Sequence, residues 1–360
     1  MRRCLTALSF SLSLALALAA CSPAGGPTPS GEPEDVAREL DRAVEELDLV
    51  GAAMAVEFSD GETWGFTSGL SRLETMEAWE PGRSIRIGSV TKTFTAALIF
   101  LLIEDGVLTL DDPLEQWVPG YYDGLGVTLR HLLSNTSGIV SYNYVGSFDD
   151  TRPWEPQELA QWAVDHEPAL RFEPGSEWEY SNTNFVLLGL VIEAATGDSY
   201  EGQFEERLTG PMGLTRTYLA GSGDMNPALV DCYERDGSNT TGHADPSFGW
   251  AAGAAVSTPE ELARWISALY GGELLSAGSL ELMTTQQVLS DGTTQDYGLG
   301  AFVERDGDDA LFGHEGGIGG YITYAFYWQA DGIALVAATN TFDTDMRTLA
   351  GYGWSALLGL

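Results

Sequence analysis

Strand-like apolar runs lie at both ends of the chain. In the N-terminal group Asp60-Gly61 predicts a hairpin turn between two such runs. The C-terminal runs are rich in β-branched and aromatic residues, and Asp331-Gly332 predicts a turn between the last two. The predicted strands are 50–58, 63–67, 297–303, 320–328 and 333–340.

Helical patterns flank and separate these strands. Residues 34–47 carry apolar side chains at helical spacing with a charged opposite face, and 344–358 is predicted as a second helix. Between the two strand groups lie mostly helical segments with long loops. This order predicts an α/β plus α fold: one antiparallel sheet built from N- and C-terminal strands, flanked by helices, with an inserted helical lobe. We expect residues 34–360 to form this domain.

The segment before the domain has a different composition. A basic start and an apolar stretch predict a secretory signal peptide over 1–20. Cys21 ends a Leu-Ala-Ala-Cys sequence that is similar to the bacterial lipoprotein box, so we expect Cys21 to be lipidated; ordinary cleavage after Ala20 is the alternative. The Pro-, Gly- and Ser-rich segment 21–33 predicts a flexible tether. The protein is therefore expected to be exported and anchored in the cell envelope.

The charge balance excludes some classes of partner. The chain has 53 acidic and 17 basic residues, a formal net charge of −36. A surface this acidic repels phosphate backbones and anionic lipid headgroups. We therefore expect no nucleic acid partner, a small-molecule or peptide substrate, and membrane contact only through the lipid anchor.

Cysteine and histidine usage indicates neither disulfides nor metals. Cys4 lies in the predicted signal and Cys21 is the predicted anchor, so Cys232 is expected to be a lone buried thiol. The four histidines are scattered, without the spacing of metal ligands. We expect no metal site and no cofactor.

Lys92 is the single lysine among the 17 basic residues. A guanidinium is effectively always protonated, whereas a buried ammonium can lose its proton. A lysine at this one position, in a chain whose other basic residues are arginine, indicates a need for a neutral amine or a small cationic head. The alternative is that this lysine is present by accident. Ser89 lies three residues earlier, which places both residues at one site.

Ser89 and Lys92 open a predicted buried helix. The run 94–103 is apolar nearly all round and ends at Asp105-Gly106; ten residues are too few to span a bilayer. Ser89 is expected at the helix start, with Lys92 one turn later on the same face. A serine hydroxyl becomes a good nucleophile when a base takes its proton, and the positive end of a helix stabilises a developing oxyanion. The pair predicts a serine hydrolase.

Three ordered motifs identify a family resemblance. Residues 89–92 read S-x-x-K, the nucleophile motif of penicillin-recognising enzymes. Variant forms of the two later motifs follow at 180–182 (Tyr-Ser-Asn) and 314–317 (His-Glu-Gly-Gly), the latter before the predicted strand at 320. From about residue 36 to 340 the chain resembles the class C β-lactamase and D,D-carboxypeptidase family, with its esterase and D-aminopeptidase relatives. The supporting stretches are 132–138, 252–260 and 297–300.

The resemblance implies a role for each motif residue. Ser89 is similar to the acylated nucleophile and Lys92 to its proton acceptor. Tyr180 corresponds to the general base or proton relay, and action as a base would require the nearby ammonium to favour phenolate. Asn182 would hold Lys92 and the substrate.

The third motif would bind substrate. The resemblance implies an oxyanion hole from the backbone N–H groups of Ser89 and Gly317, and glycines that allow close approach, Gly316 among them. His314 would be the cation or hydrogen-bond donor of this motif. Glu315 stands where β-lactamases have threonine. A carboxylate facing the substrate would repel an anion, unless alternation along the strand turns Glu315 away.

These departures shape the functional prediction. Without the third-motif lysine, efficient hydrolysis of β-lactams or of D-Ala-D-Ala is doubtful; Asn135 also stands where the family commonly has a histidine. We predict an exported acyl-enzyme hydrolase of esters, amides or peptides, with D-amino-acid cell-wall peptides among the candidates. The alternatives are a β-lactamase or D-Ala-D-Ala carboxypeptidase, and a non-catalytic envelope binding module with the same fold.

Overall fold

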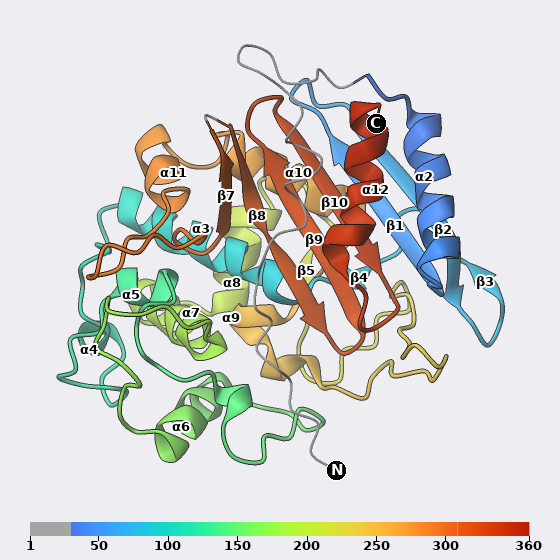
Figure 1. The fold of residues 1–360 in the computed structure, drawn as a ribbon. Coiled ribbons are helices and arrows are strands. Elements are labelled where there is room, and N and C mark those ends of the chain that lie inside the picture. The colour runs from blue at the N-terminus through green and yellow to red at the C-terminus, as the bar shows by residue number, and fades with distance from the viewer. Residues whose placement is uncertain (1–29, 308, 360) are drawn as a thin grey trace.

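A seven-stranded antiparallel sheet forms the centre of the protein (Figure 1). The computed structural model describes residues 30–307 and 309–359, so the predicted signal peptide and Cys21 lie outside the described residues. The strand order is β3-β2-β1-β10-β9-β8-β7. In chain order the strands are β1 (Gly51–Glu57), β2 (Thr63–Arg72), β3 (Glu77–Ala78), β7 (Phe302–Asp306), β8 (Asp309–Ile318), β9 (Tyr321–Trp328) and β10 (Ile333–Thr339).

The two ends of the chain meet in the middle of this sheet. β1 pairs with β10, from Ala52 opposite Thr339 to Glu57 opposite Ala334. Every residue of both strands is buried, because helices cover both faces of the sheet. The predicted antiparallel sheet built from the two termini is confirmed.

The C-terminal edge of the sheet differs from the sequence prediction. Most of the predicted strand 297–303 is loop, and β7 begins only at Phe302. β8 is missing from the prediction because three of its ten residues are glycine, which weakens a strand pattern. The third motif, expected before a strand, therefore lies within one.

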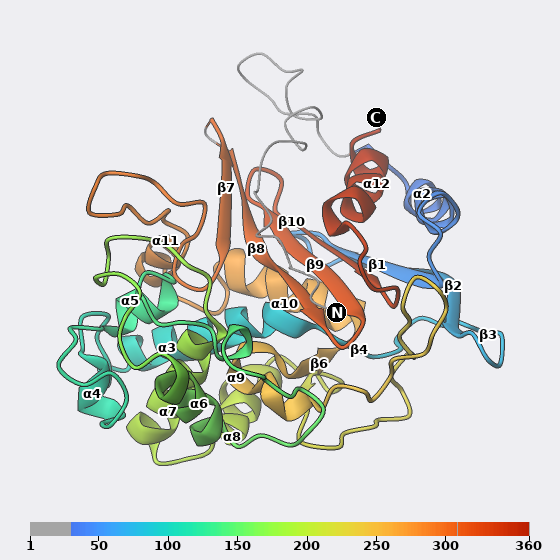
Figure 2. The same cartoon turned by 60° about the horizontal axis from the view of Figure 1, so that its bottom comes forward.

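Two terminal helices cover the outer face of the sheet (Figure 2). α2 (Pro33–Glu46) and α12 (Met346–Leu358) both pack on this face, and they confirm the two helices predicted at the ends of the domain. Val36 and Leu40 of α2 share one buried cluster with Leu349 of α12. The N-terminal and C-terminal elements thus form one layer.

A helical lobe covers the inner face. α10 (Pro259–Tyr270) packs on β1 and β10, and α3 (Thr91–Glu104) packs behind β8. Every residue of α3 from Thr91 to Phe100 is buried, as the all-round apolar run predicts. The other helices are α4 (Leu114–Trp117), α5 (Leu129–Leu133), α6 (Pro156–His166), α7 (Asn182–Thr196), α8 (Tyr200–Phe204), α9 (Trp250–Gly253) and α11 (Ala277–Met283).

Short elements connect the lobe to the sheet. A second sheet has the order β4-β6-β5, from Ile85–Arg86, Ala255–Ser257 and Tyr218–Leu219. The short helices are η1 (Gly88–Val90), η2 (Tyr142–Tyr144), η4 (Pro246–Phe248) and the π-helix η3 (Glu205–Thr209). Cys232 is a buried free thiol, as predicted. Within 30–307 and 309–359, no helix combines the length and apolarity that crossing a membrane requires.

Candidate active site

Ser89 lies at the turn between β4 and α3. Gly88 just before it has φ +51°, and a side chain there would approach the backbone nitrogen of Gly317 to 2.6 Å. Glycine is therefore required both by the left-handed backbone and by the close contact with β8. The turn places Ser89, half-buried, beside the third-motif strand and at the N-terminal end of α3.

Lys92 is fully buried and has three hydrogen-bond partners. Its Nζ lies 3.0 Å from Ser89 Oγ, 2.7 Å from Asn182 Oδ1 and 2.7 Å from the carbonyl oxygen of Ala252. The Nζ also lies over the ring of Tyr180, 4.8 Å from its centroid. No carboxylate contacts it among the described salt bridges.

This environment favours a neutral amine. Burial lowers the pKa of Lys92 well below its ordinary value, because an ammonium loses its hydration there. A neutral amine has two N–H donors and one lone pair. Asn182 Oδ1 and the Ala252 carbonyl can accept the two N–H groups, which leaves the lone pair for the Ser89 hydroxyl proton. The arrangement can act as a general base on Ser89.

Tyr180 and Asn182 come from the segment that enters α7. The Asn182 amide is oriented at both ends: its Oδ1 accepts from Lys92, and its Nδ2 donates to Asn143 Oδ1 at 3.2 Å. The backbone N–H of Asn182 donates to Ser141 Oγ at 2.9 Å, which satisfies the first turn of the helix. The second motif is thus held against the first.

The surroundings of Tyr180 favour the protonated hydroxyl. Burial raises its pKa above the ordinary value, and a hydrogen bond with Ser89 lowers it by less. Action of Tyr180 as a base would require phenolate, but burial disfavours the phenolate and a neighbouring ammonium alike. Tyr180 can pass a proton to or from Ser89, and Lys92 is the group suited to act as the base.

His314 is neutral and already bonded at both ring nitrogens. It is 1 % exposed, and burial lowers its pKa to about 3. Its Nδ1 faces the Glu315 carbonyl, so Nδ1 carries the proton and Nε2, 3.3 Å from the Tyr297 hydroxyl, accepts. Of the two roles expected for His314, the cation is therefore disfavoured, and the Nδ1–H donor is already bonded to the Glu315 carbonyl.

Glu315 points away from the site. Alternation along β8 places His314 toward Tyr180 and Glu315 toward α12, where Glu315 pairs with Arg347 at 3.0 Å. The expectation of a carboxylate facing the substrate is wrong, because successive residues of a strand point to opposite faces of the sheet.

The glycines let the nucleophile turn touch β8. A side chain at Gly316 would collide with the Ile87 carbonyl oxygen, whereas Gly317 is exposed and has room for one. β7 pairs with β8 only as far as Gly313. Among the described strands, the stretch 314–318 pairs with β9 alone, so its other edge has no strand partner with which an extended substrate would compete.

The structure adds partners that the motifs did not reveal. Asn143, Ser141 and the Ala252 carbonyl complete the hydrogen bonds of Asn182 and Lys92. The Tyr297 hydroxyl is the hydrogen-bond partner of His314 Nε2. These residues lie in or near stretches that support the resemblance, but only the tertiary contacts assign them to the site.

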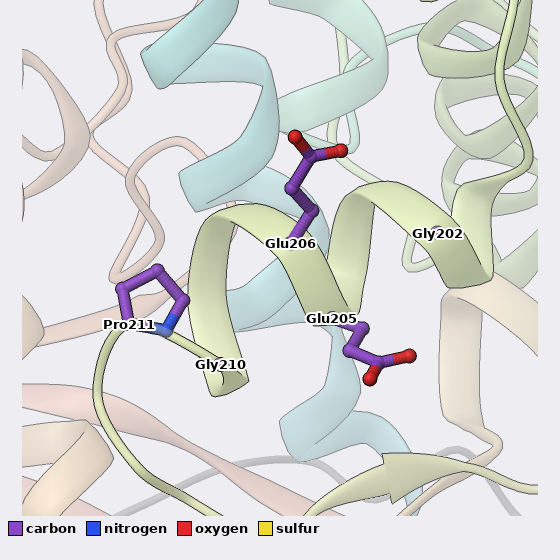
Figure 3. Close-up of a pocket in the computed structure, with 5 residues that line it drawn as sticks. All are labelled: Gly202, Glu205, Glu206, Gly210 and Pro211. Atoms are coloured by element: carbon purple, nitrogen blue, oxygen red, sulfur yellow. The ribbon is translucent and has the colours of Figure 1, made fainter.

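An open hollow elsewhere contains none of these residues (Figure 3). Its walls are glycine, proline and two glutamates whose side chains point apart, beside the π-helix η3. None of its lining residues is a nucleophile. The lining residues are Gly202, Glu205, Glu206, Gly210 and Pro211.

Comparison with known protein families agrees with the motif order. A sequence model described as Beta-lactamase matches residues 36–358, nearly the whole described domain. Penicillin-binding protein 4* of Bacillus subtilis is 31% identical over 258 residues, which cover 66% of this chain and 56% of that protein. The chain thus spans about half the length of this relative. The D-alanyl-D-alanine-carboxypeptidase/endopeptidase AmpH of Escherichia coli is 27% identical over 82% of both chains.

Solved structures share the complete fold. A D-stereospecific amidohydrolase from Streptomyces is 30% identical, with a TM-score of 0.78 over 91% of this chain and 99% of its own. A D-amino acid amidase from Ochrobactrum anthropi, complexed with L-phenylalanine amide, is 26% identical, with a TM-score of 0.81 over 91% and 98%.

Proposed function

Because this chain belongs to the β-lactamase family of serine hydrolases, we propose that it hydrolyses amide, peptide or ester bonds through an acyl-enzyme on Ser89. One observation carries the proposal: the buried Lys92 Nζ lies 3.0 Å from Ser89 Oγ, and its two other hydrogen-bond partners, Asn182 Oδ1 and the Ala252 carbonyl, are both acceptors. A binding module needs no buried amine beside a serine. Catalysis by the motif residues therefore explains a group that costs stability to bury.

Acylation begins with the transfer of the Ser89 proton to Lys92. Ser89 Oγ then bonds to the substrate carbonyl carbon, and the negative charge on the carbonyl oxygen is stabilised by the backbone N–H groups of Ser89 and Gly317. The proton returns through the Tyr180 hydroxyl to the leaving amine or alcohol as its bond to carbon breaks. Asn182 holds Lys92 and the substrate amide during this step.

Deacylation uses the same groups on water. Lys92 takes a proton from a water molecule, with the Tyr180 hydroxyl as the relay, and the water oxygen bonds to the acyl carbon. The bond to Ser89 Oγ breaks, Ser89 regains a proton, and a carboxylic acid leaves. Each turnover thus consumes one water and restores the starting protonation.

The site favours a substrate without a carboxylate at the third motif. His314 is neutral and bonded to Tyr297, and Glu315 lies on the other face, so this motif offers no side-chain cation to an anion. Amides of D-amino acids carry no such carboxylate, and the names of two full-length structural neighbours support this class. We therefore place D-amino acid amides and neutral esters ahead of penicillins.

A D-Ala-D-Ala carboxypeptidase is the second candidate. It is supported by the similarity to the Escherichia coli carboxypeptidase/endopeptidase over 82% of both chains. The free edge of β8 beside Ser89 also suits an extended peptide. Hydrolysis of a D-Ala-D-Ala peptide faster than of D-phenylalanine amide would favour it.

The nucleophile is tested by covalent labelling. We expect a fluorophosphonate probe to modify Ser89, located by mass spectrometry, and Ser89→Ala to abolish both labelling and turnover. D- and L-phenylalanine amide, a neutral ester, a chromogenic β-lactam and a D-Ala-D-Ala peptide then rank the substrates. Labelling of another serine, or turnover by Ser89→Ala, rejects the mechanism.

Envelope anchoring completes the proposal. It rests on the apolar N-terminal stretch, on the lipoprotein-like sequence ending at Cys21 and on the Pro/Gly/Ser-rich segment that follows. Intact mass from a bacterial membrane fraction is expected to exceed that of the polypeptide from Cys21 onward by a diacylglycerol, and Cys21→Ala is expected to lose this increment. Recovery of only unmodified protein in a soluble exported fraction would contradict anchoring.

A further inference from the structure

Asn135 has a backbone conformation that few side chains adopt. Its φ is +58° and its side chain is completely buried, in the loop after α5 (Leu129–Leu133). Asparagine and aspartate tolerate this left-handed region, and glycine adopts it freely. The backbone conformation alone would therefore favour glycine, so the presence of an asparagine side chain needs a separate reason.

The hydrogen bonds of Asn135 bracket Tyr180. Its carbonyl oxygen accepts from the backbone N–H of Glu179 at 3.0 Å, and its side-chain Oδ1 accepts from that of Ser181 at 3.1 Å. One residue thus bonds to the backbone N–H groups of the residues before and after Tyr180. Its Oδ1 also accepts from Asn184 Nδ2 at 3.0 Å, in the first turn of α7.

Ser181 gives α7 no side-chain cap of its own. It is the N-cap residue, yet its side chain makes no capping hydrogen bond, and the bonds that orient this turn come from the loop containing Asn135. The position of Asn182, which contacts Lys92, follows from how this turn is held. Displacing the turn would move Tyr180 and Asn182 together.

The other end of the Asn135 amide faces the third motif. Its Nδ2 is buried and has no hydrogen-bond partner among the described residues. Burial raises the pKa of the nearby Tyr297 hydroxyl, and the Asn135 amide opposes this shift to a smaller extent. Tyr297 in turn meets His314 Nε2. Asn135 therefore stands between the second and third motifs and touches neither Ser89 nor Lys92.

We propose that Asn135 is a positioning residue, whose side-chain amide fixes Tyr180 and Asn182 against Ser89 and Lys92. The inference rests on the acyl-enzyme function proposed above and extends it to a residue outside the three motifs. Misplacing a reacting group by about 1 Å can cost about 10²-fold in rate. Loss of the amide is thus expected to lower kcat while KM changes little.

Two substitutions separate the side chain from the backbone. Asn135→Gly keeps the left-handed backbone and the bond from Glu179 but removes Oδ1, whereas Asn135→Asp keeps an oxygen at the Oδ1 position. Ser134→Ala is the matched control, because Ser134 is also buried in the same loop. Among the described residues its Oγ bonds only to Arg130, His131 and Thr136.

The single lysine supplies a readout that needs no activity. Protein labelled with 13Cε-lysine should give a single lysine resonance, because Lys92 is the only lysine of the sequence. Tyr180 and His314 are the titratable groups beside Lys92. At fixed pH, Asn135→Gly is expected to shift this resonance and to reduce kcat for a neutral ester at least ~10-fold, with KM within ~3-fold. Ser134→Ala is expected to leave the resonance in place and kcat within ~3-fold of wild type.

The outcomes decide the proposal in each case. An unshifted resonance with wild-type kcat in Asn135→Gly overturns it, as do equal losses in Asn135→Gly and Ser134→Ala. If Asn135→Gly does not fold, the folded Asn135→Asp variant decides the question. A kcat above about a tenth of the wild-type value supports the role of Oδ1, and a kcat below about a tenth rejects it. If wild-type protein neither labels nor turns over, the proposed function fails, and the Lys92 resonance still tests Asn135.

Discussion

At the scale of single residues, burial controls the chemistry of the site. The same loss of hydration lowers the pKa of Lys92, raises that of Tyr180 and lowers that of His314, so all three groups are driven toward their neutral forms. A neutral amine is a base and a neutral phenol is a proton carrier. The fully buried position of Lys92 thus explains why lysine persists there in a chain whose other basic residues are arginine.

Lys92→Arg should fold and lose activity. A guanidinium stays protonated and cannot accept the Ser89 proton, so kcat should fall by at least ~10²-fold, the scale of a lost acid–base group. Steady-state kinetics with a neutral ester, beside a thermal unfolding curve, would measure both effects. Near-normal kcat in a folded variant would mean that the lone lysine is a compositional accident.

The pH dependence should follow Lys92 and not Tyr180. Activity requires the neutral amine, so it should rise with pH through the Lys92 pKa, which lies below the ordinary lysine value of about 10.4. Tyr180→Phe should lower kcat by ~10-fold or more without moving this acid limb, because the phenol is protonated throughout. A kcat/KM profile for each protein checks this; a limb that disappears in Tyr180→Phe would assign the base to tyrosine.

At the scale of elements, the site depends on three segments that meet at one edge of the sheet. η1 brings Ser89 against β8, the entry to α7 brings Tyr180 and Asn182, and α9 supplies the Ala252 carbonyl. The contact between η1 and β8 leaves no space for a side chain at Gly316. Backbone packing therefore sets the distance between nucleophile and third motif.

Gly316→Ala and Gly317→Ala should differ in stability. The first places a methyl group against the Ile87 carbonyl oxygen, and overpacking of this kind costs about 1–3 kcal/mol. The second places it 3.5 Å from Ile322 Cδ1, an ordinary contact, so the free energy of unfolding should change by less than about 0.5 kcal/mol. Urea unfolding of the two variants provides the comparison; equal losses would show that β8 and η1 are not tightly packed.

At the scale of the whole molecule, the acidic surface surrounds a site that carries little charge. The net charge of −36 produces self-repulsion in the folded state, while the Ser89 site holds neutral groups and no carboxylate contacts Lys92 among the described salt bridges. The acidity therefore concerns solubility and salt response more than catalysis. The two helices of the outer face, at the ends of the domain, lie on the opposite side of the sheet from the site.

Salt should stabilise the folded protein. Raising NaCl from about 0.1 M to about 1 M shortens the Debye length from about 10 Å to about 3 Å and screens the repulsion. The midpoint of thermal unfolding should rise by several degrees, and equally in KCl, because screening does not depend on the identity of the ion. A flat or falling midpoint would contradict this account.

The sequence by itself determined the sheet from two chain ends, the buried helix after Ser89 and the order of the three motifs. These features follow from apolar periodicity and from residue types at fixed spacing, which are local properties. The sequence did not reveal β8, because the glycines in this strand weaken the pattern from which strands are predicted.

Tertiary structure alone decided the protonation states and the direction of side chains. From the sequence, His314 could be a cation or a hydrogen-bond donor, and Glu315 could face the substrate or point away. Burial favours a neutral His314, and strand register turns Glu315 toward Arg347. Asn135 looked like an unexplained replacement until its contacts on both sides of Tyr180 were visible. Hydration and register depend on neighbours far away in the chain, so no local pattern encodes them.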